Sequence, residues 1–173
     1  MIRFTNDINK IVVHHTGTSL ISSGEEHNRD HAMREEFGSP FDILINPDGK
    51  IDLSPQWIYA IESAQYEKDV HFSRLFISTS HHPARIGKTV EEKNKMVHIA
   101  VVGDFNIRGA SPYQVNGVLK TLEFLCRGLQ LCAKQSIYYY SEFYLDSSPG
   151  IYFPAKEFLI NSLMEKKILQ NLC

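Results

Sequence analysis

The chain has 173 residues, of which 43% are hydrophobic and 22% are charged, and its formal net charge is −2. This length and composition fit one globular domain with a substantial core, so we predict a single domain over residues 1–173. The slight acidity argues against a sequence-independent nucleic-acid binder, because such proteins need an excess of lysine and arginine to neutralise phosphates.

The lack of a recognisable signal peptide and the odd number of cysteines suggest an intracellular protein. Residues 1–9 lack the long apolar core of a signal peptide, and no apolar run is long enough to span a bilayer. We therefore expect a cytoplasmic protein without a membrane partner, or a secreted one if a signal has been removed. The cysteines, Cys126, Cys132 and Cys173, are odd in number and two of them fall within one predicted helix, so we expect no disulfide framework.

The segment Lys10–Thr18, KIVVHHTGT, predicts a central strand that stops at a polar loop. Side chains alternate faces along a strand, so His14 and His15 point to opposite sides of the sheet. If one of them lines a site, the other packs or faces water. The alternative is that both are hydrogen-bonded scaffold.

Residues 22–37 have helix start and stop signals, and His27 and His31 stand four apart on one face of this helix. The polar residues between them favour a solvated face over a metal site. Residues 39–53 then predict a hairpin, because Asn-Pro-Asp-Gly is strong turn chemistry. Trp57 follows the hairpin as a core residue or as the floor of a cleft.

Residues 66–95 predict a long surface excursion that contains one short strand, of the kind that forms binding loops or lids. The next clear pattern is Met96–Asp104, whose nearly continuous apolar run predicts a strand covered on both faces. His98 interrupts this run, either as a satisfied core histidine or as a group that reaches the site.

The C-terminal half predicts two helices and one strand. Ser111 and Pro112 begin the clearest helix, whose apolar residues recur every three or four positions to Leu129. Residues 136–140 are a strand candidate, and a final amphipathic helix spans about 158–169. Strands that alternate with helices predict an α/β domain, with a sheet flanked by helices on both faces.

The motifs IVVHHTGT, GSPFDILINPDGKID, HIAVVGDFN and SPYQVNGVLKTLEFL occur in this order. In this order they resemble the peptidoglycan-recognition proteins and the related zinc-dependent N-acetylmuramoyl-L-alanine amidases, including phage lysozymes of the amidase type. The resemblance covers Ile11 to about Pro154, with 66–95 as a poorly matched insertion. It implies a central mixed β-sheet and cleavage of the amide between the lactyl group of muramic acid and L-alanine. Zinc, held by two histidines and a cysteine or aspartate, would activate the water.

Carried over residue by residue, the resemblance leaves one zinc ligand, His14. The other positions carry groups that suit the chemistry poorly: Phe41 for the catalytic tyrosine, Tyr138 or Tyr140 for the second histidine, Asp146 for the assisting lysine, and Ser148 for the cysteine or aspartate. Serine and tyrosine hydroxyls are poor zinc ligands at neutral pH because neither is readily deprotonated.

We therefore predict a degenerate amidase fold without a cofactor, which binds a muropeptide, another small ligand or a protein partner. The expected ligand-binding residues are His14, His15, Phe41, Trp57, Tyr138, Tyr140 and Ser148. The alternative is an active zinc amidase whose metal site is rebuilt from His14, His98 and one of His81, His82, Glu142 or Asp146.

Overall fold

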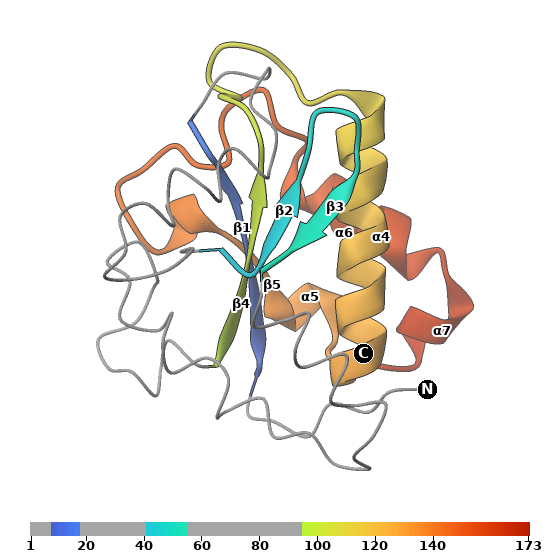
Figure 1. Ribbon diagram of the computed structural model, residues 1–173. Coiled ribbons are helices and arrows are strands. Elements are labelled where there is room, and N and C mark those ends of the chain that lie inside the picture. Colours follow the sequence, from blue (N-terminus) through green and yellow to red (C-terminus); the bar gives the residue numbers. More distant parts are fainter. Residues whose placement is uncertain (1–7, 18–40, 55–94) are drawn as a thin grey trace.

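The computed structural model describes residues 8–17, 41–54 and 95–173, and its centre is a five-stranded sheet of order β3-β2-β4-β1-β5 (Figure 1). The strands are β1 Lys10–His15, β2 Ile43–Ile45, β3 Ile51–Leu53, β4 Met96–Val101 and β5 Ile137–Tyr139. β3 pairs with β2 in antiparallel fashion and the other pairings are parallel. The expected mixed sheet of an α/β domain is therefore confirmed.

β1 and β4 form the middle of the sheet, and their apolar runs are buried on both faces. Their parallel register places Val12 beside His98 and His14 beside Ala100. Because side chains alternate, His14 and His98 share one face and are diagonal neighbours on it.

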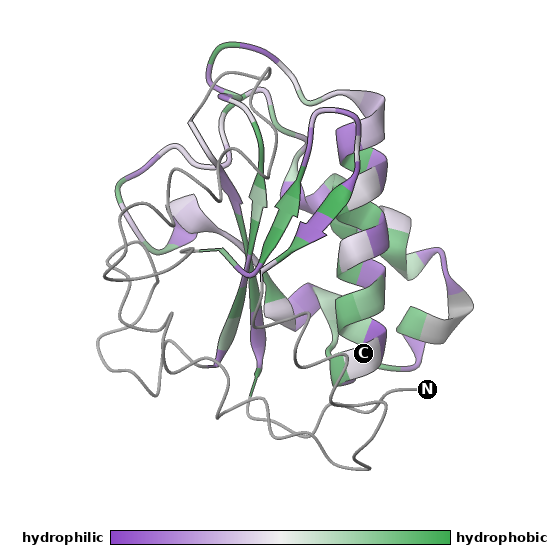
Figure 2. Ribbon diagram, viewed as in Figure 1, coloured by the Kyte–Doolittle hydropathy of each residue, from purple (hydrophilic) through white to green (hydrophobic). Residues whose placement is uncertain are grey.

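The opposite face of the sheet packs against helices and forms the main core (Figures 1 and 2). α4, Pro112–Leu129, begins at a capping box in which the Ser111 hydroxyl accepts from the Gln114 amide, and its stripe includes Val118, Leu122 and Leu125. The smaller helices add residues to the same core: α5 Ala133–Ser136, α6 Lys156–Met164 and α7 Lys167–Gln170. Among the described residues, all α-helices pack on this one face, and the predicted helix 22–37 lies outside them.

The hairpin of β2 and β3 has the predicted turn, and the turn is fixed against α4. Gly49 has φ +82°, and a Cβ atom built there would lie 2.4 Å from the carbonyl oxygen of Tyr113. The Ser111 hydroxyl donates a hydrogen bond to the Pro47 carbonyl, 3.1 Å away. The N-terminus of α4 therefore holds the hairpin at the edge of the sheet.

The C-terminal segment differs from the prediction in two ways. The expected single helix over 158–169 is two helices, α6 and α7, because Lys166 adopts an extended backbone between them. α4 ends at Leu129, so Cys132 lies at the start of α5 and not in the same helix as Cys126.

The expectation that no disulfide forms is wrong. Cys132 and Cys173 are joined, and Cys126 is a buried free thiol. The return of α7 toward α5 brings the two sulfur atoms together, and a count of cysteines does not reveal such a tertiary contact. In the part of the chain that the structure describes, no helix has both the length and the apolar character needed to cross a membrane.

Candidate ligand-binding site at the end of β1

Two buried histidines lie at the centre of the face opposite the helices. His14 Nε2 and His98 Nδ1 are 2.8 Å apart and share a hydrogen bond. His14 is 4% exposed and His98 is fully buried. The structure thus brings together two residues that the sequence paired only in the zinc-amidase alternative, and His98 is a buried histidine that is hydrogen-bonded to His14.

Aromatic rings surround His14. The Phe41 ring meets it edge-on at a centroid distance of 5.3 Å, and the Tyr140 ring lies 4.5 Å away. Phe41 comes from the segment just before β2, and Tyr140 begins the 3₁₀ turn η2, Tyr140–Glu142, after β5. Strand β1 and the segments just before β2 and just after β5 therefore bring one imidazole and two aromatic rings to one place.

The donor atoms of this cluster do not fit a zinc ion in the arrangement observed. A hydrogen bond between His14 Nε2 and His98 Nδ1 requires a hydrogen on one of these nitrogens, and that nitrogen has no lone pair for a metal. Phe41 supplies no ligand atom. Among the residues that the structure describes, no group of three or more histidine, cysteine or acidic side chains could hold a metal ion.

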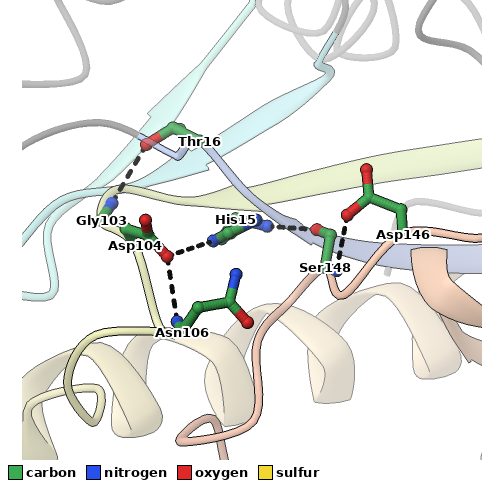
Figure 3. Close-up of polar contacts among 7 residues, drawn as sticks. All are labelled: His15, Thr16, Gly103, Asp104, Asn106, Asp146 and Ser148. Carbon is green, nitrogen blue, oxygen red and sulfur yellow. Dashed lines mark hydrogen bonds and ion pairs between the residues drawn. The ribbon is translucent and has the colours of Figure 1, made fainter.

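Ser148 is turned toward the strand instead of toward His14. Its hydroxyl accepts a hydrogen bond from the backbone amide of His15, 2.9 Å away, and its own amide donates to Asp146 Oδ1 at 2.9 Å (Figure 3). Ser148 is 3% exposed. The residue expected at the metal-ligand position therefore joins the 146–150 turn to the end of β1.

His15 lies on the helix side of the sheet, as the alternation predicts. Its Nδ1 atom is 3.6 Å from Asp104 Oδ1 (Figure 3). Its ring lies 6.4 Å from that of Phe105. Burial lowers the pKa of His15, whereas the nearby carboxylates of Asp104 and Asp146 act in the opposite direction. His15 is therefore not part of the aromatic cluster around His14.

The Tyr140 ring also contacts a second aromatic ring that lies nearer the surface. Its ring stacks on that of Tyr144 with a centroid distance of 5.1 Å and an interplanar angle of 28°. Burial raises the pKa of Tyr140, and Tyr144 and Asp146 raise it further. The phenol is therefore a neutral hydrogen-bonding group at physiological pH.

The remaining predicted residues lie elsewhere. The Tyr138 ring packs at 5.3 Å from Phe143, with the ammonium groups of Lys10 and Lys156 5.9 Å and 5.6 Å from its centroid. Tyr138 thus belongs to a separate cation–π cluster on β5. Trp57, His27, His31, His81 and His82, and the 66–95 insertion except Lys95, lie outside the described residues.

Glu142 and Asp146, offered as metal ligands in the alternative, are engaged in other contacts. Glu142 accepts from the Tyr139 amide at 2.7 Å and pairs with Lys156 Nζ at 2.6 Å. Asp146 accepts from the Ser148 amide. Both carboxylates therefore stabilise the 139–148 segment.

Asp42 was not among the residues predicted from the sequence. This carboxylate is 1% exposed and accepts a hydrogen bond from the His98 backbone amide, 2.7 Å away, while its own amide donates to the His98 carbonyl at 2.9 Å. Asp42 thereby fixes Phe41 and the start of the hairpin against β4. The available signal was an acidic residue within an apolar strand, where an unpaired carboxylate would be costly.

Comparison of the sequence with models of known families and with curated proteins finds no match. Among solved structures, the fold is similar to N-acetylmuramoyl-L-alanine amidase LysC from Clostridium intestinale. The TM-score is 0.63 at 19% identity, and the match covers 91% of this chain and 85% of that chain. Peptidoglycan recognition protein SD of Drosophila matches with TM-score 0.57 and 14% identity, over 88% of this chain and 81% of that one.

A third similar structure is a complex of tracheal cytotoxin with the ectodomains of peptidoglycan recognition proteins LCa and LCx. It matches with TM-score 0.58 and 16% identity, over 88% of this chain and 82% of that chain. Identities this low show a shared fold and no more. The resemblance inferred from the order of the motifs is thus confirmed at the level of the fold.

Proposed function

We propose that this chain binds a peptidoglycan fragment on the sheet face around His14 and does not hydrolyse it through zinc. The observation that carries the proposal is the environment of His14, whose Nε2 atom is hydrogen-bonded to His98 and whose ring is enclosed by Phe41 and Tyr140. A catalytic zinc site needs three protein ligands and one open position.

The ligand class follows from the fold and from the chemistry of the cluster. Structures with this fold include one described as binding tracheal cytotoxin. Aromatic rings with a few placed polar groups are typical of small-ligand sites. The Cys132–Cys173 disulfide favours the secreted alternative, because disulfides persist in oxidising compartments.

The first experiment measures binding and hydrolysis together. Purified protein is mixed with peptidoglycan sacculi, and the bound fraction and the released peptide are both quantified. We expect retention on the sacculi without release of stem peptide, and weaker retention after Tyr140→Ala. Release of peptide at enzyme-like rates would contradict the proposal.

The second candidate function is an active zinc amidase with substituted ligands. The observation that favours it is that His14 and His98 lie side by side on one face, because a shift of either ring would present two imidazoles to an ion. Metal analysis of protein purified without a histidine tag separates the candidates. About one tightly held zinc per chain, lost in His14→Ala, would support the amidase.

A further inference from the structure

Three neighbouring rings lead from the core to the surface at this site: the rings of His14 and Tyr140 are tilted by 38° to each other, and those of Tyr140 and Tyr144 are stacked. His14 is buried, Tyr140 is half-buried, and Tyr144 is 46% exposed. Centroid distances of 4.5 Å and 5.1 Å join the rings in this order. The exposed end of the stack is therefore supported by a ring that is itself packed on buried residues.

The backbone holds Tyr144 in this position. The amides of Phe143 and Tyr144 both donate to the Tyr140 carbonyl, at 3.0 Å and 3.3 Å. The loop is closed further along by a 2.9 Å hydrogen bond from the Ser141 amide to the Ser148 carbonyl. A ligand that used the Tyr144 ring would therefore find it already ordered, and binding would cost less conformational entropy.

Polar groups belong to the same closed loop. Asp146 is exposed, and its carboxylate is oriented by the Ser148 amide while its own amide donates to the Tyr144 carbonyl at 2.8 Å. The neighbouring Ser141 and Ser147 are exposed and carry hydroxyl groups. The loop thus combines an aromatic face with hydrogen-bonding groups that suit a polyol.

We propose that the Tyr140–Tyr144 stack is a platform for a sugar ring of the peptidoglycan fragment, and that Tyr144 makes the chain prefer fragments that carry sugar over free stem peptide. This inference rests on the proposed function. A pyranose ring has a face of C–H bonds that packs on an aromatic ring, and hydroxyl groups at its edge that bond to acceptors such as Asp146. An exposed tyrosine supplies such a surface at low entropic cost.

The test compares three probes by calorimetry: a disaccharide with its stem peptide, the same peptide without sugar, and a chito-oligosaccharide. We expect Tyr144→Ala to weaken binding of both sugar-bearing probes about tenfold and to leave binding of the free peptide unchanged. Tyr144→Phe keeps the ring and should bind like the wild type. Tyr113→Ala is the matched control, because Tyr113 is 70% exposed but lies on α4.

The outcomes distinguish failure of the sugar platform from failure of the proposed binding function. If the wild type binds the disaccharide–peptide and Tyr144→Ala binds it equally well, the platform is wrong and the proposed function stands. If Tyr144→Ala weakens binding of the free peptide as much as that of the sugar probes, the assigned specificity is wrong. If the wild type binds none of the probes, both proposals fail.

Discussion

His14 and His15 are adjacent in sequence and meet different surroundings. The side chain of His15 is largely buried near Asp104, and burial lowers its pKa from the ordinary value. A histidine whose folded pKa is lowered binds its proton more weakly in the folded chain than in the unfolded chain. Protonation therefore favours unfolding.

The first prediction concerns the pH dependence of stability. The stabilisation from neutral His15 is fully present above the unfolded pKa, about 6.5, and is lost as the pH falls through the lower folded value. We expect the melting temperature of the wild type to fall more between pH 7 and pH 5 than that of His15→Gln. Parallel curves for the two proteins would show that His15 does not titrate in this range.

The second prediction concerns Ser148. Ser148→Ala removes the acceptor for the His15 amide and should lower the free energy of unfolding by about 1–2 kcal/mol, because a buried donor loses its partner. Urea denaturation measures the change. Ser147→Ala is the control, since Ser147 is exposed and its loss should change stability by less than about 0.5 kcal/mol.

At the scale of elements, local sequence patterns predicted the helices and turns correctly where the local conformational preference agrees with the tertiary packing. The apolar stripe and Ser111-Pro112 predicted α4, and the turn residues predicted the hairpin. The break at Lys166 was not predicted, because the helical pattern continues through it. Tertiary packing overrides propensity there, since Leu169 of α7 lies in the core.

The third prediction tests the contact between the hairpin and α4. Gly49→Ala places a Cβ atom against the Tyr113 backbone and forces a left-handed φ, so we expect a loss of about 2 kcal/mol or more in urea denaturation. Gly109→Ala is the control, because its nearest neighbour would be 3.4 Å away. Equal stability of the two variants would mean that the turn relaxes freely.

At the scale of the molecule, the sequence predicted the fold and which residues gather at the end of β1. It did not predict the hydrogen bonds among these residues. The motif order identified His14, Phe41 and Tyr140 as neighbours, and in the structure the rings of Phe41 and Tyr140 both contact that of His14. The hydrogen bond between His14 and His98 depends on strand register, and the hydrogen bond from the His15 amide to the Ser148 hydroxyl joins residues 133 positions apart. Neither follows from local pattern.

The fourth prediction concerns the disulfide, which links residues 41 apart. Constraining a loop of this size should stabilise the fold by about 4 kcal/mol in the chain-entropy model, so reductant should lower the melting temperature by roughly 10 °C. The double variant Cys132→Ser, Cys173→Ser should melt at the lower temperature with or without reductant. An unchanged melting temperature on reduction would contradict this.

Thiol counting gives an independent check on the same pairing. Burial raises the pKa of Cys126 to about 12, so this thiol should resist alkylation in the native protein. We expect no label before reduction and two labels on native protein after it.

The disulfide also determines whether the two pieces of the chain stay together after the backbone is cut. Leu145 is fully exposed in the loop after η2, and it lies between Cys132 and Cys173. Proteolysis there would leave two polypeptides covalently attached, which migrate as one band on a non-reducing gel and separate once dithiothreitol is added. A nicked chain of this kind would keep the strands and the last two helices in a single particle, so the Tyr144 loop can be opened enzymatically without dissociating the rest.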